Sequence, residues 1–522
     1  MDNARKILTG TILLTAASFL MQTVGVSFNV WLTARLGESG LGLFQLILTV
    51  YNLAVTLGCG GVRLAATRLA VEGEARHEST RRTVYRCIRY ALVTGLLAAF
   101  ALFSLADIAA NYWLSDPNAA LPLRILAMSL PFVAMSSALN GYFTAVQKVG
   151  RYSAVRIAEQ AVKIGIVMAF MGRLLPKGIR YGCVAIVIGV LCSELFSFLC
   201  LFILYNIEKE KYRDNPQKFS LRDLLHISVP DVSGAGARSV LLTIEHLLIP
   251  RGFRACGVSA EQALSVYGNI HGMVFPILLY PSAILSSLAG LLIPEIAGQY
   301  AKGLNDRIVY IVRQVLRLTL LFALGTAGIL YVFADGLSQV VYHDSDCVFY
   351  MRVLSPLIPV MYCDMTVDGM LKGLDQQRAC MRYNILDSAV CVVLVCVLLP
   401  RFAVKGYVFI LFLSEILNFY LSIRRLTKVT TVEIDLSGEL FMPLGCGICA
   451  PVCVHLTLSL TGLSAMWSKG VLVFGIAAAA AGYFLMLYGF GCFEKKDAEQ
   501  FLRIAGLNRL KNNTCKMRKN LV

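Results

Sequence analysis

Charged residues are scarce in this sequence, and their scarcity excludes an ordinary soluble protein. Asp, Glu, Lys and Arg make up 15% of the 522 residues, whereas hydrophobic residues make up 57%. A water-soluble domain could not bury so many apolar side chains. Apolar runs of about twenty residues recur along the whole sequence, and each is long enough to cross a bilayer as a helix. We therefore expect an all-α polytopic membrane protein.

The signatures of an enzyme are missing as well. No Lys is followed by Ser or Thr, so the sequence has no G-x-x-x-x-G-K-[ST] phosphate-binding loop, and we expect no ATP hydrolysis. A membrane-bound ligase or acyltransferase would need a sizeable outer loop with catalytic His or Asp, and only His343 stands in such a loop. The sequence predicts no enzyme, no metal site and no cofactor, except that Na+ or H+ could serve as a coupling ion.

Fourteen apolar runs are predicted to span the membrane, in groups of six, six and two. Their approximate bounds are 9–33, 41–61, 88–108, 122–146, 154–174, 183–205, 223–249, 268–293, 309–333, 350–372, 382–400, 404–424, 440–462 and 470–491. The predicted parts are an N-lobe (1–207), a cytoplasmic linker (208–221), a C-lobe (222–425), two extra helices (426–491) and a basic amphipathic cytoplasmic tail (492–522).

The distribution of Lys and Arg predicts the orientation of these spans. The segments on the N-terminal side of the membrane hold 35 of them and the opposite segments hold 11. Because basic loops stay inside, we expect a multi-pass protein of the cell membrane with both termini in the cytoplasm. The net charge of +16 is spread over short loops between spans. This pattern favours anionic membrane lipids as partners and argues against nucleic acid.

Helix breakers stand inside three of the predicted spans. In a membrane such breaks are tolerated where neighbours or a wet cavity satisfy the freed backbone groups, although a packing kink is the simpler interpretation of any one proline. The breakers are Pro230, Gly234 and Gly236 in the seventh span, Pro276 and Pro281 in the eighth, and Pro356 and Pro359 in the tenth.

Landmark residues recur at a constant offset of 228, which indicates an internal repeat. The matching residues are charges at the ends of spans, a proline in an apolar run, a glycine near its end and an acid in the next run. Two parallel copies of one unit predict a transporter with its substrate site between the halves, the copies being related by about 180° around the membrane normal. The pairs are Asp107 and Asp335, Arg124 and Arg352, Pro131 and Pro359, Gly141 and Gly369, and Glu159 and Asp387.

Ionisable residues inside the predicted spans are the candidate functional residues, because a charge at that depth is costly. Those assigned to substrate binding are Arg238, Glu245, Arg63, Lys163 and His271. Those assigned to ion coupling are Asp364, Glu159, Asp387 and Glu415. Arg238 would suit a phosphate, which a guanidinium can bind through two hydrogen bonds.

Structural interpretations of the same residues stay open. Glu159 and Lys163 are four residues apart, so they could form a salt bridge on one helix face. Arg238 could pair with Asp364 or Asp231, and His271 could be a neutral core histidine. Two acids on one face, such as Asp364 and Asp368, could bind a cation or share a proton.

Two stretches resemble the stage V sporulation protein B group of polysaccharide-export flippases, within the multidrug/oligosaccharidyl-lipid/polysaccharide (MOP) superfamily. One begins at Lys6-Ile-Leu-Thr-Gly10 and continues through Ala34-Arg35-Leu36-Gly37 and Gly40-Leu-Gly42-Leu-Phe44; the other runs from Glu245 to Glu295. The resemblance implies a MATE-like fold with two pseudo-symmetric six-helix lobes and two extra C-terminal helices. It also implies movement of an undecaprenyl-linked cell-wall or polysaccharide precursor by alternating access, with cell-wall synthesis enzymes as possible partners.

The resemblance reaches single residues at one motif. Glu245 takes the place of an acid that the group usually has before its Val/Ile-Pro-Arg motif, here Ile249-Pro250-Arg251. Relatives often carry an arginine near Met21-Gln22, which is absent here. The positive charge for a pyrophosphate would then come from Arg63, Arg238 or Lys163.

A second transport function is compatible with the same architecture. A MATE-type multidrug antiporter, driven by Na+ or H+, would need acids and aromatics in its cavity, whereas a pyrophosphate-lipid site needs Arg or Lys. The predicted spans carry both signs of charge, and Arg238 and Lys163 favour the flippase. A scaffold of the division or sporulation machinery, without transport of its own, is the remaining alternative.

Overall fold

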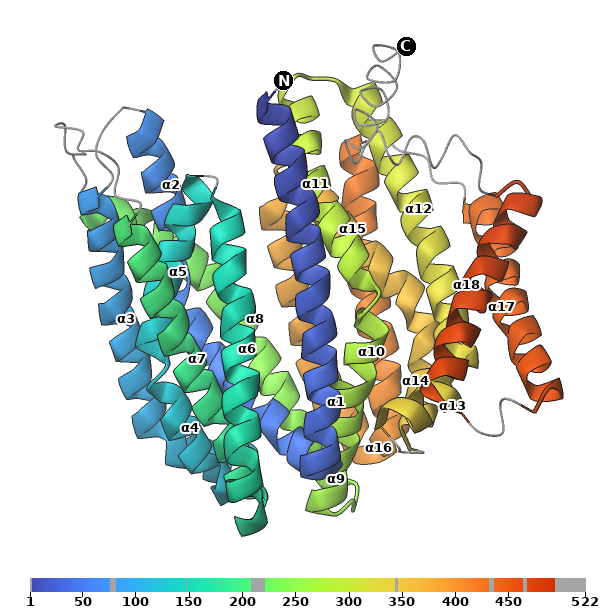
Figure 1. The fold of residues 1–522 in the computed structure, drawn as a ribbon, viewed down its shortest axis with the longest axis horizontal. Helices are drawn as coiled ribbons and strands as arrows, with labels where there is room; N and C mark the ends of the chain where they lie inside the picture. Colours follow the sequence, from blue (N-terminus) through green and yellow to red (C-terminus); the bar gives the residue numbers. More distant parts are fainter. Residues whose placement is uncertain are drawn as a thin grey trace, which may run out of the picture. The chain divides into compact units, whose positions relative to one another are not determined.

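The computed structural model describes residues 2–75, 81–146, 148–207, 221–342, 346–430, 436–462 and 467–492, and these are almost entirely helical (Figure 1). The predicted all-α architecture is confirmed. The predicted tail from residue 493 on, and nearly all of the predicted linker, lie outside the described residues.

The helices follow one another along the chain with short connections. They are α1 (Asp2–Cys59), α2 (Val62–Ala75), α3 (Arg81–Ile108), α4 (Ala120–Ala127), α5 (Leu130–Ala145), α6 (Val149–Leu174), α7 (Ile179–Ile207), α8 (Leu221–Ala255), α9 (Ala260–Gly268), α10 (Phe275–Leu279), α11 (Ser282–Ala301), α12 (Asn305–Val332), α13 (Ala334–Leu337), α14 (Asp346–Leu354), α15 (Ile358–Gly373), α16 (Gln377–Thr430), α17 (Leu436–Leu460) and α18 (Lys469–Gly489). Short π-helical segments occupy Ala109–Leu114, Asn269–Val274 and Ser338–Tyr342.

The number of membrane spans is compatible with the prediction of fourteen. In the described part of the chain, nine helices are long and apolar enough to cross a membrane, or ten if the bent pair Pro117–Ala127 and Leu130–Ala145 is one span. Two helices are too long for a single crossing, because the 54 residues of α16 would extend about 80 Å, whereas the hydrocarbon core measures about 30 Å. Each is kinked at one non-helical residue, Gly37 in α1 and Ala403 in α16.

Two compact units are distinguished within the chain. Unit 1 comprises Met1–Val30, Asn269–Asp387 and Val404–Val522, and unit 2 comprises Trp31–Gly268 and Ser388–Ala403. The predicted lobe boundaries follow a different criterion, the grouping of spans along the sequence, and stay a prediction.

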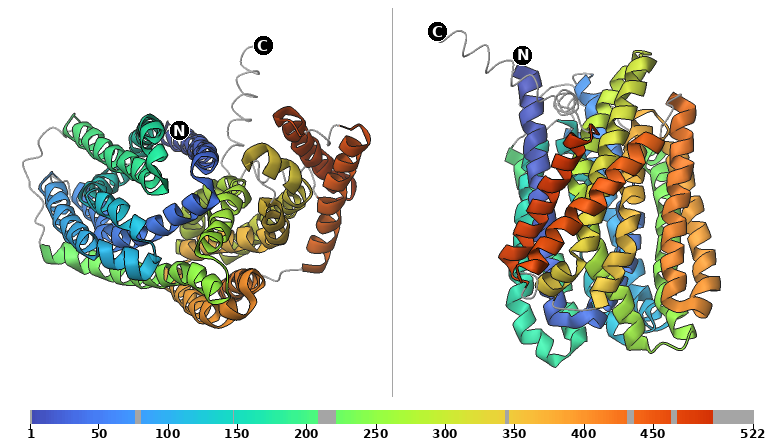
Figure 2. Two further views of the ribbon diagram at one scale, coloured as in Figure 1. Left: turned by 90° about the horizontal axis from the view of Figure 1, so that it is seen from below. Right: turned by 90° about the vertical axis from the view of Figure 1, so that its right-hand side faces the viewer.

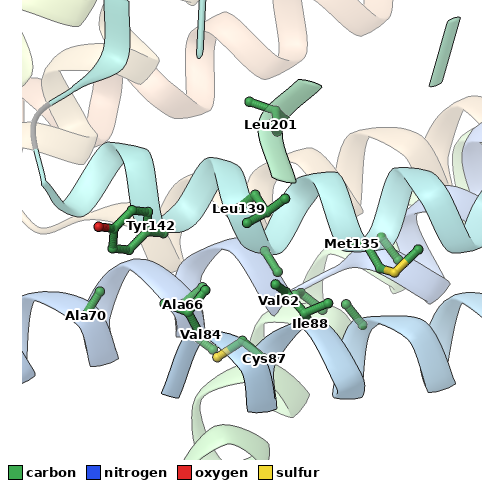
Figure 3. Packing of buried hydrophobic residues seen from close by; sticks show 14 of the residues in the cluster. Val62, Ala66, Ala70, Val84, Cys87, Ile88, Met135, Leu139, Tyr142 and Leu201 are labelled. Carbon is green, nitrogen blue, oxygen red and sulfur yellow. The ribbon is translucent and has the colours of Figure 1, made fainter. Parts of the chain in front are cut away.

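Each unit has its own apolar core. In unit 2 the core lies mainly among α2, α3, α5 and α7, where Val62, Ala66, Cys87, Leu139 and Leu201 meet (Figure 3). In unit 1 one core joins α11, α12, α15 and α16. A smaller cluster joins α12 to α17 and α18, which lie side by side in Figures 1 and 2. The two last helices therefore pack against each other and against α12.

The internal repeat is visible in the helix boundaries. α5 begins at Leu130 and ends at Ala145, and α15 begins and ends 228 residues later, at Ile358 and Gly373. Pro131 and Pro359 occupy the first turn of these two helices, where the missing N–H of proline costs no hydrogen bond. The offset of 228 is thus confirmed as a repeat of local structure, and the predicted rotation between the copies stays a prediction.

An ion pair is repeated at the same offset. Nη2 of Arg124 lies 2.5 Å from Oδ2 of Asp107, and Arg352 forms the equivalent pair with Asp335. All four side chains are more than a third exposed, so each pair contributes about 1 kcal/mol or less to stability. The repeated ion pair is evidence that these charged residues hold the same position in both copies.

The predicted helix breakers act in two of the three spans. The eighth span is divided into a π-helical segment, α10 and α11, with Pro281 between α10 and α11, and a 3₁₀ turn containing Pro356 separates α14 from α15. The prediction was wrong for the seventh span, because α8 is continuous from Leu221 to Ala255. One of its two glycines serves packing instead: a Cβ on Gly236 would lie 3.0 Å from Cδ2 of Leu57.

Gly141, one of the repeated landmarks, lets two helices of unit 2 approach closely. A Cβ at this position of α5 would lie 2.5 Å from the carbonyl oxygen of Arg63 and 2.8 Å from Cβ of Ala66, both on α2. Because the first of these atoms is backbone, the helices would have to separate. The glycine therefore fixes the spacing of α2 and α5.

We expect Gly141→Ala to destabilise the protein by about 1–3 kcal/mol, the usual cost of overpacking. Gly165→Ala on α6 is the control, since a Cβ there meets no atom within 4 Å and alanine favours the helix. The melting temperatures of the purified variants in detergent measure the difference. Equal melting temperatures for the two variants would show that α2 and α5 are not held by this contact.

Candidate functional site

One face of α8 in unit 2 carries three charged residues at intervals of seven. They are Asp231, Arg238 and Glu245, and residues seven apart share a helix face because seven residues make nearly two turns. Arg238 is exposed, while the two acids are partly buried. A charged stripe on a helix long enough to span the membrane suits a water-filled cavity rather than lipid.

Arg238 has neither an ion pair nor a hydrogen bond with any residue that the structure describes. Asp231 is about 10 Å away along the helix axis, two turns earlier, and Asp364 belongs to the other compact unit. The structural pairing that the sequence left open is therefore not formed with Asp231. The guanidinium is left available for an anion that is not part of the described chain.

A second group of charges lies on α6 and α7 of unit 2. Nη1 of Arg156 donates to both carboxylate oxygens of Glu159, at 2.8 and 2.7 Å. Glu194 interacts electrostatically with Glu159, Arg156 and Lys163. Glu159 is the most buried carboxylate of the group, with 9% of its surface exposed. Its charge is compensated by Arg156, a residue that the sequence analysis did not single out.

Arg63 interacts with a residue of α6, and its own helix, α2, packs against α8. Arg63 is exposed near the start of α2. Tyr152 of α6 interacts electrostatically with Arg63, Arg156 and Glu159 alike. Four of the five predicted substrate residues therefore belong to unit 2: Arg63, Lys163, Arg238 and Glu245.

The fifth, His271, belongs to unit 1 and has a partner within it. Its Nε2 lies 2.6 Å from the hydroxyl of Tyr407. His246 of unit 2 makes a similar contact, with Nδ1 2.8 Å from the hydroxyl of Tyr267. Both arrangements agree with hydrogen-bonded core histidines, the structural interpretation that the sequence left open for His271.

Unit 1 contains an acidic cluster formed by three of the four predicted coupling residues. Nδ2 of Asn418 donates to Oδ2 of Asp364 at 2.9 Å, and the Ser414 hydroxyl donates to Asp387 at 2.9 and 3.0 Å. Glu415 interacts electrostatically with Asp364 and Asp387. The fourth candidate, Glu159, lies in unit 2.

The acidic cluster has spare acceptor capacity. Among the described residues, Oδ1 of Asp364 and Oδ1 of Asn418 are buried without a hydrogen-bond partner of good geometry, although the Ser422 side chain is close to Asp364. Carboxylates so placed can share protons or bind a small hard cation. No group of three His, Cys, Asp or Glu residues in the described chain is positioned to hold a metal ion.

Sequence reasoning missed the polar residues that support these charges. Arg156 stands one turn before Glu159 at the end of a span, where an arginine is ordinary. Ser414 and Asn418 are four residues apart and flank Glu415 in an apolar run. Small polar residues at helical spacing next to an intramembrane acid were the signal that could have identified them.

Comparisons with known proteins agree with this architecture. Residues 7–256 match the model of a family described as polysaccharide biosynthesis protein. Stage V sporulation protein B of Bacillus subtilis (strain 168) is 26% identical over 517 residues, which covers 96% of this chain and 98% of that protein. Sporulation protein YkvU of the same organism is 24% identical and covers 74% of this chain and 86% of that protein.

Solved structures show which fold this is. The lipid II flippase MurJ in an inward closed conformation has a TM-score of 0.63 at 15% identity, covering 92% of this chain and 98% of that one. An inward-facing multidrug resistance MATE family transporter of the MOP superfamily has a TM-score of 0.62 at 13% identity, covering 81% of this chain and 100% of that one. The MATE-like fold and the resemblance to the stage V sporulation protein B group are confirmed.

Proposed function

Because this multi-pass membrane protein resembles the stage V sporulation protein B flippases of the MOP superfamily, we propose that it moves an undecaprenyl-linked cell-wall or polysaccharide precursor across the cytoplasmic membrane by alternating access. One observation carries the choice of substrate: the exposed guanidinium of Arg238, without a protein partner in the described chain, on a charged face of α8. A lone arginine within a membrane costs at least about 2.5 kcal/mol. A substrate that supplies an anion offsets this cost.

The pyrophosphate of a lipid-linked glycan is such an anion. A guanidinium binds phosphate through two parallel hydrogen bonds, which fix its orientation. Arg63 and Lys163 belong to the same compact unit as Arg238 and add positive charge there. We assign Arg238 to the pyrophosphate, Arg63 and Lys163 to assisting roles, and Glu245 to the glycan side of the same α8 face.

The acidic cluster of Asp364, Asp387 and Glu415 provides the coupling in this proposal. Three neighbouring acids, one of which (Asp364) has a buried oxygen without a hydrogen-bond partner among the described residues, can exchange protons as the surroundings change between two states. H+ is our choice of coupling ion because neighbouring carboxylates, one of them with a buried unpaired oxygen, can share a proton. Glu159 is held by Arg156 and is assigned a structural role.

A cation-coupled multidrug antiporter is the second candidate. The observation that favours it is the same acidic cluster, since neighbouring carboxylates attract cationic compounds. This alternative leaves Arg238 without a function, because a cationic drug would be repelled by it. The relatives named as flippases and transporters support transport rather than catalysis in either case. Cytoplasmic termini and contact with cell-wall synthesis enzymes remain parts of the proposal.

The test of the substrate uses vesicles reconstituted with a fluorescent undecaprenyl-pyrophosphate glycan, whose accessibility from outside reports flipping. We expect Arg238→Ala to slow flipping at least about tenfold, the loss that one hydrogen-bonded charge contact implies. Arg238→Lys should restore part of the rate, because an ammonium supplies the charge without the planar fork. Arg401→Ala, which removes an exposed arginine from α16, is the matched control.

Unchanged flipping by Arg238→Ala would contradict the assignment of this residue. If the unaltered protein moves a cationic dye but not the lipid, the flippase proposal is wrong and the antiporter is the function. Circular dichroism and the melting temperature of each variant show that the loss of transport is not a loss of folding.

The test of coupling imposes a pH gradient across the same vesicles. We expect the unaltered protein to flip faster with the gradient in one direction than in the other. Asp364→Asn should flip at a rate that no longer depends on the gradient, because the amide cannot take up a proton. Asp306→Asn, an exposed position in the first turn of α12, should behave as the unaltered protein. A Na+ dependence that replaces the pH dependence would assign the cluster to Na+ instead.

A further inference from the structure

The face of α3 that points away from the core of unit 2 changes character along the helix. At its start this face carries Arg82, Arg86 and Arg89, all of them exposed. Their spacing of four and three residues places them on one stripe. The opposite face, which includes Thr83, Cys87 and Ala91, is buried in the core.

The same stripe continues as exposed apolar side chains. Val93 is 56% exposed, Leu97 is 64% exposed and Phe100 is 74% exposed. α3 lies within a candidate membrane span with a mean hydropathy of 2.0. An apolar face of this kind on a spanning helix contacts the acyl chains of the bilayer. The arginines therefore lie where that lipid-facing stripe reaches the headgroups.

Two of these arginines are uncompensated. Arg82 and Arg89 make no ion pair or hydrogen bond with residues that the structure describes. They are seven residues apart, about 10 Å along the helix. The headgroup region of one leaflet is only about 5–8 Å deep, so Arg89 must extend its side chain from the edge of the hydrocarbon toward the phosphates. Together they present two cations at the depth of lipid phosphates.

We propose that this face of α3 is a binding site for an anionic phospholipid of the inner leaflet. The phosphate contacts Arg82 and Arg89, and one acyl chain lies along Val93, Leu97 and Phe100. The site is distinct from the Arg238 face of α8, since it lies on the side of α3 opposite the one buried in the core of unit 2. The inner-leaflet assignment rests on the basic loops that place this end of α3 in the cytoplasm.

Native mass spectrometry of the whole protein, purified in detergent, tests the proposal. The added lipids are phosphatidylglycerol and diphosphatidylglycerol as anions and phosphatidylethanolamine as the zwitterion. We expect the anionic lipids to bind to the unaltered protein in preference to the zwitterion. Arg82→Gln with Arg89→Gln should weaken the tightest anionic binding about 25-fold, since each basic residue at the surface contributes about a factor of five.

Two further variants make the result specific. Arg82→Lys with Arg89→Lys should keep most of the binding, because the charges remain. Arg378→Gln with Arg382→Gln removes two exposed arginines from the start of α16 and should leave the tightest binding unchanged. An equal loss in this control would show only a general attraction of basic loops for anions. Displacement of the bound phospholipid by an undecaprenyl-pyrophosphate lipid would show that α3 holds the transported substrate, and either result would overturn the proposal.

Discussion

The cost of a charge inside a membrane governs the arrangement of this protein. A charged group at that depth needs a compensating charge, a set of hydrogen bonds or access to water. All three kinds of compensation occur among the described residues. Glu159 is compensated by Arg156, Asp364 and Asp387 accept hydrogen bonds from Asn418 and Ser414, and Arg238 stands on an exposed face. The charge of Arg238 has no partner among the described residues and is available to an anion from outside the chain.

The two copies of the repeat share a backbone but differ in their chemistry. Glu159 and Asp387 are equivalent positions at the offset of 228, yet their partners are an arginine and a serine. The position equivalent to Arg156 is Asn384, whose side chain donates to the carbonyl of Cys380 at 2.8 Å. A duplicated scaffold with an arginine-paired acid in one copy and a cluster of three acids in the other can divide two tasks. In our proposal these tasks are substrate binding and proton coupling.

The repeat could be predicted from the sequence because charges, prolines and glycines hold fixed positions in the fold. Gly141 is a landmark because backbone atoms of α2 leave no room for a Cβ. The sequence identified each acid of unit 1 as a candidate residue, but it could not show that the three lie close together in the fold. Asp364 and Glu415 are 51 residues apart, and only the packing of α15 against α16 brings them together. The continuous helix through Pro230 was not predictable either, since neighbouring helices stabilise it after the chain has folded.

The central claim is that the Arg238 face of α8 meets water rather than lipid. The most direct measurement replaces Arg238 and, separately, Val240 with cysteine and follows labelling by a membrane-impermeant thiol reagent, with peptide mass spectrometry to separate the new cysteine from the native ones. Val240 is also exposed, at 38%, but points about 160° away around the helix. Our account predicts rapid labelling at position 238 and slow labelling at position 240. Labelling at 238 that is as slow as at 240 would contradict it.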